Sequence, residues 1–242
     1  MLTRTIAMAL GMGCLLNTPA LASDHLETKW IRDSAEYWTI TRQTYRMALQ
    51  SVQEAQIKQK RWAVVLDVDE TVLDNSSYQL ERASYGDSFA MESWSAWCER
   101  RVATPVPGVV EFISAIRKLG GRVVFLSNRS VNNQQATIDN LDQLGLWDAK
   151  RDTICLQSED EAYTKTARRA ELRSGKGPCS VDEKPISVLG WFGDNIHDFP
   201  EEGEEEMTGG RDAQFGTRFF LFPNPMYGSW TRKTTRPLDA AE

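Results

Sequence analysis

Short apolar runs alternate with helical patterns along most of the chain. Residues 62–66 and 123–126 are uninterrupted apolar stretches rich in valine, which is typical of strands buried on both faces. Similar runs occur at 153–156, 187–192 and 219–222. Because helical stripes separate these runs, the pattern predicts βαβ units and an α/β fold, with a mainly parallel sheet covered by helices on both faces.

Apolar residues at steps of three or four predict the helices. The first stripe runs from residue 30 to about 58, with Asp33 and Glu36 as a capping box at its start. Two more stripes, at 109–119 and 138–144, each end at glycine. The segment 78–101 is expected to add further helical structure between the first two strands.

The first 22 residues predict a secretory signal peptide. Arg4 precedes an apolar stretch at 6–16, and small residues precede the expected cleavage site. The stretch is too short to span a bilayer comfortably. We therefore expect a periplasmic or secreted protein with a single domain over 23–242. Lipidation of Cys14 is the alternative, and only an outer-membrane lipoprotein of that kind would contact a membrane.

Composition narrows the possible functions. The 242 residues include 28 Lys+Arg and 34 Asp+Glu, a net charge of −6, and no basic block that would bind a nucleic-acid polymer. His25 and His197 are the only histidines, which argues against a Ser-His-Asp hydrolase and a multi-histidine zinc centre. Carboxylates must therefore carry the chemistry.

The chain without its signal peptide keeps three cysteines. An odd number allows at most one internal bridge, and Cys155 with Cys179 is the pair we expect if one forms in an oxidising compartment. Cys98 is at least as well explained as an ordinary buried thiol. The odd count is also compatible with a homodimer.

Polar side chains follow three of the apolar runs. Asp67 and Asp69 follow the first run, residues 127–129 (Ser-Asn-Arg) follow the second, and Asp194 follows the fourth, with Asp198 just beyond. Ligands of parallel sheets bind at the carboxyl ends of the strands, so we expect these side chains to meet. Crowded carboxylates need a cation or partial protonation, and oxygen ligands favour Mg²⁺. The sequence therefore predicts a magnesium site there.

These acids have two other interpretations, a calcium-binding loop and ordinary loop or cap residues. Counted from Asp67 as an EF-hand loop, position six is Val72 where the turn needs glycine, and position twelve is Tyr78 where glutamate should stand. Any single aspartate is better explained as a solvated loop residue or a helix cap. Aspartate after two fully apolar strands, with a strand-end serine between them, is a much less expected coincidence.

The stretch 67–75 (DVDETVLDN) resembles the first motif of the haloacid dehalogenase superfamily, and Ser127, Lys165 and Asp194 stand where its next three motifs would be. The chain is further similar to class C bacterial acid phosphatases, the lipoprotein e type, at residues 74–78, 127–129 and 223–228. The resemblance implies a Rossmann-like core with a small helical cover. It also implies Mg²⁺ dependence and hydrolysis of phosphate monoesters, commonly nucleotides, as by an acid phosphatase or 5′-nucleotidase.

Such hydrolysis needs a nucleophile, a proton for the leaving group and neutralisation of the phosphoryl oxygens. Asp67 is expected to attack phosphorus and form an aspartyl-phosphate. Asp69 lies two residues on, on the same side of an extended segment, and would protonate the leaving group. Ser127 and Lys165 would bind the phosphoryl group. The expected metal ligands are Asp67, the backbone carbonyl of Asp69 and Asp194, with Asp198 either supporting these ligands or as a further ligand.

The assignment of Lys165 rests on a basic, helix-like stretch, and Lys176 and Lys184 are its rivals. The residues expected to contact the substrate are Asn75, Tyr78, Asn128, Arg129 and Tyr227. Aromatic side chains of the cover segment could stack a nucleobase, although core packing explains most of them equally well: Tyr78, Tyr85, Phe89, Trp94 and Trp97.

The same residues leave three alternative functions open. A phosphotransferase would use the same residues and differ only in water access. A catalytically silent surface-binding module on the same fold is a second alternative. A haloacid dehalogenase is the least favoured, because that chemistry has no use for Asp69.

Overall fold

The computed structural model describes residues 25–160 and 162–232. The predicted signal peptide (1–22) and the alternative lipid site at Cys14 lie outside the described residues. Among the helices that are described, none is both long and apolar enough to cross a membrane.

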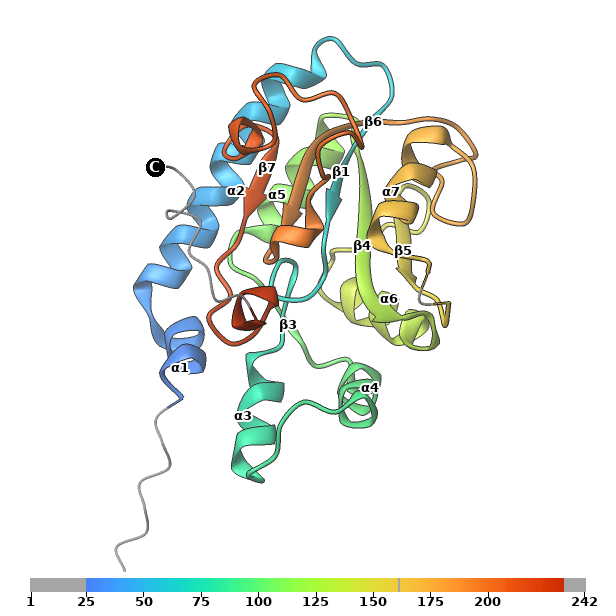
Figure 1. The fold of residues 1–242 in the computed structure, drawn as a ribbon. Helices are drawn as coiled ribbons and strands as arrows, with labels where there is room; N and C mark the ends of the chain where they lie inside the picture. The colour runs from blue at the N-terminus through green and yellow to red at the C-terminus, as the bar shows by residue number, and fades with distance from the viewer. Residues whose placement is uncertain (1–24, 161, 233–242) are drawn as a thin grey trace, which may run out of the picture.

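Five parallel strands form the central sheet, which confirms the predicted α/β class (Figure 1). The order β5-β4-β1-β6-β7 places β1 in the middle, where Leu66 pairs with Phe125 on one side and Phe192 on the other. After β1 the chain forms β4 and β5 on one side of this strand and then β6 and β7 on the other. The carboxyl end of β1 therefore lies at a topological switch point. The strands are β1 (Trp62–Leu66), β4 (Arg122–Ser130), β5 (Thr153–Gln157), β6 (Ser187–Gly193) and β7 (Phe219–Leu221).

Helices cover both faces of the sheet because the strands are apolar on both faces. Val64 belongs to a core with Tyr45 and Phe112, whose rings lie 5.0 Å apart, and the neighbouring Val65 belongs to a second core with Leu172. Alternate residues of one strand thus serve opposite layers. The helices outside the cover are α1 (Leu26–Asp33), α2 (Ala35–Gln56), α5 (Val109–Lys118), α6 (Gln134–Gln143) and α7 (Lys165–Ser174). Short 3-10 turns are η1 (Val131–Asn133), η2 (Ile196–Asp198), η3 (Asp212–Gln214) and η4 (Ser229–Arg232).

The first predicted helix is two helices, and its predicted capping box is wrong. Ser34 has an extended backbone between α1 and α2, and its Oγ accepts a hydrogen bond from the Tyr37 N–H at 3.0 Å. Serine is a strong N-cap because its hydroxyl satisfies a free amide at the helix start. Asp33 instead ends α1.

A small cover lies beyond the carboxyl end of β1 (Figure 1). The cover is inserted in a two-stranded ribbon that begins seven residues after β1. Tyr78 anchors the cover: its buried ring packs edge-to-face against Trp94, with the ring centroids 5.1 Å apart. The ribbon and cover comprise β2 (Leu73–Asp74), α3 (Ser76–Ser84), α4 (Met91–Arg100) and β3 (Thr104–Pro105). The segment that carries Asp67 and Asp69 is therefore tied directly to the cover.

One disulfide links Cys155 of β5 to Cys179 beyond α7, with their Cα atoms 5.2 Å apart. This confirms the expected pair, and Cys98 is a buried free thiol. The bridge ties the loop after α7 to the edge strand of the sheet.

Removing the bridge should lower stability. The two cysteines are 24 residues apart, and a loop of that size corresponds to about 3 kcal/mol of unfolding free energy in the chain-entropy account. We expect Cys155→Ser/Cys179→Ser to lose this amount in urea unfolding. Dithiothreitol should lower the midpoint of the wild type and leave the double variant unchanged. An unchanged midpoint in the double variant would contradict the prediction.

Candidate active site

Asp67 is the first residue after the central strand. Its N–H donates to the carbonyl of Phe192 at 2.9 Å, which continues the β1–β6 ladder by one residue. Its carboxylate is buried and lies close to those of Asp194 and Asp198, with one oxygen from each of the three within 4.8 Å of the other two. The two strand ends and the η2 turn thus bring three predicted side chains together.

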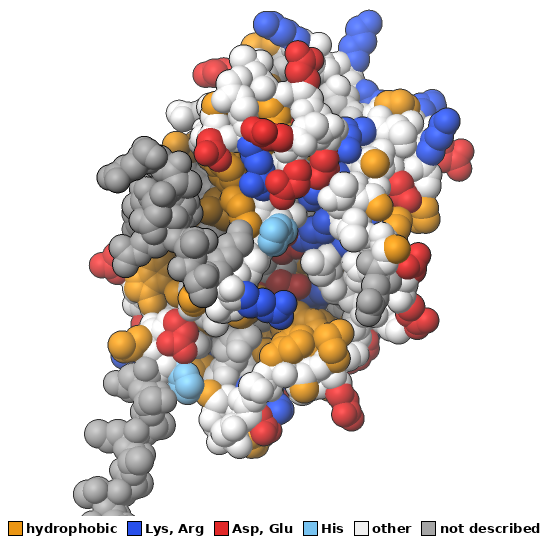
Figure 2. Space-filling model, in the orientation of Figure 1, with side chains coloured by type: hydrophobic (Ala, Val, Ile, Leu, Met, Phe, Trp, Pro, Cys, Tyr) orange, Lys and Arg blue, Asp and Glu red, His pale blue; other side chains and the backbone are white. Residues whose placement is uncertain are grey.

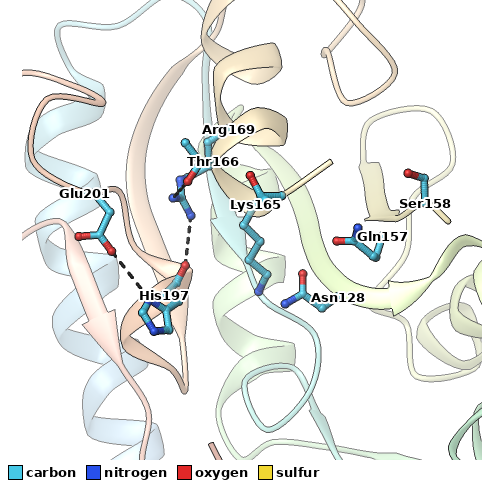
Figure 3. Close-up of a pocket in the computed structure, with 9 residues that line it drawn as sticks. Asn128, Gln157, Ser158, Lys165, Thr166, Arg169, His197 and Glu201 are labelled. Carbon is cyan, nitrogen blue, oxygen red and sulfur yellow. Dashed lines mark hydrogen bonds and ion pairs between the residues drawn. The ribbon is translucent and has the colours of Figure 1, made fainter. Parts of the chain in front are cut away.

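Lys165 reaches this group from the first position of α7. Its Nζ is 2.6 Å from Asp67 Oδ1 and 2.5 Å from Asp198 Oδ1. Figure 3 shows its side chain extending from the helix past Asn128. Lys176 and Lys184, the rivals for this position, are exposed on the surface.

Three carboxylates and one ammonium leave an excess of buried negative charge. Burial raises the pKa of Asp67 to about 7, although Lys165 opposes the shift. Burial and the charge of Asp198 raise the pKa of Asp194 well above its usual range. Burial alone would lower the pKa of Lys165, but Asp198 and Asp67 raise it, so the lysine stays charged. An oxygen-only donor set with this excess charge fits a hard divalent cation.

One side chain and one backbone amide hold Asp194 and Asp198 in place. Asn224 Nδ2 donates to Asp194 Oδ2 at 2.7 Å, and the Asn195 N–H donates to Asp198 Oδ2 at 2.9 Å. Gly193 matters here because a Cβ at this position would collide with the side chain of Asp198. The small residue before Asp194 thus allows the second aspartate to fold back over the strand end.

The carboxylate of Asp69 points to a different set of partners. Its Oδ1 accepts hydrogen bonds from Arg129 Nε at 3.0 Å, Arg129 Nη2 at 2.8 Å and Asn75 Nδ2 at 2.9 Å. It does not belong to the three-carboxylate group. The predicted metal contact through its backbone carbonyl stays a prediction.

The structure corrects several predicted substrate contacts. Asn75, Tyr78 and Arg129 are at most 2% exposed, so a substrate cannot reach their side chains. Tyr78 packs in the core with its hydroxyl 2.9 Å from Ser93 Oγ, and Asn75 and Arg129 are committed to Asp69. The Tyr227 hydroxyl points inward and donates to the carboxylate of Glu70. Asn128, by contrast, lines the open cavity beside Lys165.

Ser127 lies inside β4, which continues to Ser130 and does not end at Leu126 as predicted. Its Oγ accepts the Arg129 N–H at 3.1 Å. Arg168 of α7, fully buried, donates to the Ser127 carbonyl and to Asn128 Oδ1, both at 2.6 Å. Arg168 therefore fixes the Ser127 carbonyl and the Asn128 side chain at the end of β4. It was missed because its short basic stretch contains three similar cations.

Glu70 was also missed. It has a left-handed backbone (φ 56°), and its buried carboxylate accepts the Asn75 N–H at 3.0 Å as well as the Tyr227 hydroxyl. A non-glycine residue holds this conformation only when its surroundings compensate the strain. Burial raises the pKa of Glu70 to about 8. No feature of the sequence separates Glu70 from an ordinary loop acid.

Two glutamates of the acidic stretch 201–206 form ion pairs with arginines. Glu204 accepts from Arg169 Nη2 at 2.6 Å, and Glu205 accepts from Arg218 Nη2 at 3.0 Å. Arg169 also donates to the carbonyl of His197 at 3.2 Å. Arg169 thus links Glu204 to the η2 turn that carries Asp198.

A polar cavity of about 430 Å³ opens beside Lys165 (Figure 3). In Figure 2 the corresponding face is hollowed near its centre, where acidic and basic side chains gather. His197 lies at the cavity wall with its side chain mostly exposed, 3.9 Å from Glu201. The cavity is lined by Asn128, Gln157, Ser158, Thr164, Lys165, Thr166, Arg169, His197 and Glu201. Together with the buried carboxylates, this offers a nucleophile, a cation and an open approach for a small anionic molecule.

Known proteins resemble this chain in both sequence and structure. The model of HAD superfamily, subfamily IIIB (Acid phosphatase), matches residues 17–230. Among solved structures, the class C acid phosphatase from Bacillus anthracis superposes with a TM-score of 0.70 at 30% identity, covering 85% of each chain. Its tungstate-bound crystal structure gives 0.71 at 28% identity, covering 88% of this chain and 91% of that one.

Two plant proteins are more distant relatives. Acid phosphatase 1 of Solanum lycopersicum is 27% identical over 163 residues, 67% of this chain and 57% of that protein. The stem 28 kDa glycoprotein of Glycine max is 26% identical over 168 residues, 67% of this chain and 58% of that protein. The chain thus spans less than two thirds of the length of these relatives.

Proposed function

Because the chain belongs to subfamily IIIB of the HAD superfamily, the acid phosphatases, we propose that it hydrolyses phosphate monoesters through an aspartyl-phosphate on Asp67. One observation carries the proposal: the carboxylate at the end of the central strand lies 2.6 Å from a buried lysine and within reach of two further aspartates. A carboxylate beside a cation can attack the phosphorus atom of a phosphate ester, because the same cation neutralises the negative charge of the phosphoryl oxygens.

In the first step, an oxygen of Asp67 forms a bond to phosphorus while the bond to the leaving oxygen breaks. Lys165 neutralises charge on the phosphoryl oxygens. Asp69 gives a proton to the leaving oxygen. In the second step, Asp69 takes a proton from water, whose oxygen attacks phosphorus and releases Asp67.

The phosphoryl group needs donors as well as cations. The backbone around Ser127 and Asn128 lies on the other side of Asp67 from Asp194, and Arg168 holds it rigid through two hydrogen bonds of 2.6 Å. A rigid donor set costs little reorganisation when charge develops. We therefore assign this segment to binding of the phosphoryl oxygens.

A divalent metal fits the remaining charge. Asp67, Asp194 and Asp198 would hold it, and we propose Mg²⁺ because all donors are carboxylate oxygens. When bound, the ion supplies further positive charge to the phosphoryl oxygens.

Metal removal tests this assignment. Phosphate release from p-nitrophenyl phosphate and nucleoside monophosphates should disappear in EDTA and return with Mg²⁺. Asp194→Asn should raise the Mg²⁺ concentration for half-maximal activity by at least about 10-fold, because it removes an anionic oxygen from the site. Asp212→Asn, in the η3 turn outside this site, is the matched control. Full activity in EDTA, or an unchanged Mg²⁺ requirement in Asp194→Asn, would contradict the assignment.

We propose nucleoside monophosphates among the substrates. Trp94 of the cover is half-buried, and the guanidinium of Arg129 lies 5.6 Å from the centre of its ring. Arg129 contacts Asp69, the proposed proton donor, so the Trp94 side chain lies on the leaving-group side of the site. An aromatic side chain there can stack a nucleobase.

Export is part of the proposal. It is supported by residues 1–22, which have the pattern of a signal peptide. The Cys155–Cys179 bridge adds support, because disulfides persist chiefly in oxidising compartments.

A further inference from the structure

The carboxylate of Asp69 is held by one oxygen only. Arg129 donates to Oδ1 from both Nε and Nη2, and Asn75 Nδ2 donates to the same atom, at 2.8 to 3.0 Å. Within residues 25–160 and 162–232, no hydrogen bond reaches Oδ2. The side chain of Asp69 is 18% exposed, whereas that of Arg129 is 1% exposed.

We propose that Arg129 is a positioning residue that makes Oδ2 of Asp69 the oxygen that gives and takes the proton. A carboxylate oxygen has about two lone pairs, so three donors leave Oδ1 no room for a proton. Oδ2 is then the only free position. The inference rests on the proposed function, in which Asp69 is the general acid and base.

The arrangement around Arg129 is fixed in advance. Its Nη2 also donates to Asn75 Oδ1 at 3.2 Å, and its guanidinium lies over the ring of Trp94. The same Asn75 oxygen accepts from Trp97 Nε1 at 2.9 Å. Strand β4 and cover helix α4 together therefore hold the proton donor, which is the rigid support that a proton-transfer group needs.

The effect of Arg129 on the rate should depend on how strongly the leaving oxygen needs a proton. When the ester bond breaks, the leaving oxygen takes the proton from Asp69 Oδ2 while Asp67 bonds to phosphorus. In the hydrolytic step a water proton returns to Oδ2. A weakly basic leaving group departs without the proton, but a strongly basic one does not. Loss of Arg129 should therefore lower kcat/KM most for esters with strongly basic leaving groups.

The test compares kcat/KM, which covers the steps up to formation of the aspartyl-phosphate. The substrates are 2,4-dinitrophenyl, p-nitrophenyl and phenyl phosphates and glycerol 2-phosphate, in rising order of leaving-group basicity. Arg129→Gln should lower kcat/KM for the last two at least about 10-fold more than for the first, since general acid catalysis is worth roughly 10²–10⁴-fold. On phenyl phosphate, Asp69→Asn/Arg129→Gln should be no slower than Asp69→Asn alone.

Arg168→Gln is the matched control, since Arg168 is also a buried arginine at the site but supports the phosphoryl side. Its loss should be equal for all four esters. Arg129→Lys keeps the charge without the two parallel donors and should show the same selectivity more weakly. If Arg129→Gln fails to fold, the selectivity of Arg129→Lys among the four esters tests the inference.

An equal loss across the four esters in the Arg129 variants, or losses that multiply with that of Asp69→Asn, would overturn the inference. These outcomes differ from failure of the proposed function. In that case the wild type itself would release no phosphate from any ester, and the inference would fall with it.

Discussion

Asp67→Asn should lower kcat for p-nitrophenyl phosphate by at least about 10³-fold, because no other group can replace the nucleophile cheaply. Asparagine has the shape of aspartate but no charge for attack on phosphorus. It also removes the partner that lies 2.6 Å from Lys165 Nζ. The loss should be the same for nucleoside monophosphates. Steady-state kinetics in excess Mg²⁺ measures it.

Asp182→Asn is the control for this substitution. Asp182 is exposed and pairs with Arg61 and Arg122, at the opposite end of strands β1 and β4 from the site. It should keep wild-type kcat. A loss of less than 10-fold in Asp67→Asn, with unfolding unchanged, would show that the phosphoryl group is not transferred to this carboxylate.

Lys165→Gln should lower kcat by roughly 10²–10³-fold, the size expected for one preorganised donor at a developing charge. Lys165 is the only cation that contacts Asp67 among the described residues. Glutamine could donate a hydrogen bond but would leave the phosphoryl charge and the two carboxylates without their ammonium. The change should appear with every ester, since Lys165 acts on the transferred group and not on the leaving group.

Lys176→Gln and Lys184→Gln are matched controls, because these two lysines were the rivals of Lys165 in the sequence and both are exposed. Neither should change kcat measurably. If one of them lost as much activity as Lys165→Gln, the assignment of the lysine would be wrong.

The sequence was sufficient for the fold because buried parallel strands are continuous apolar runs. Residues 62–66 were predicted as a strand and form β1, and 187–192 form most of β6. The meeting of Asp67 with Asp194 and Asp198 was also predictable, since the carboxyl ends of parallel strands share one edge.

Other features depend on tertiary contacts that local sequence does not contain. Tyr78 was expected at the substrate because it follows the first motif, yet the cover helix turns it into the core against Trp94. Arg129 was expected to bind substrate, but its guanidinium contacts Asp69, a pairing between β4 and the segment after β1 that local sequence does not contain. Glu204 stands in an acidic stretch, and nothing in the local sequence marks Arg169 as its partner.

Trapping the covalent intermediate tests the central claim most directly. The enzyme is quenched in acid during turnover of p-nitrophenyl phosphate, reduced with borohydride and digested, and the peptides are analysed by mass spectrometry. Borohydride converts an aspartyl-phosphate to homoserine. We expect homoserine at position 67 in the wild type, and none there when substrate is omitted. Turnover without modification of Asp67, or with homoserine at another aspartate, would contradict the mechanism.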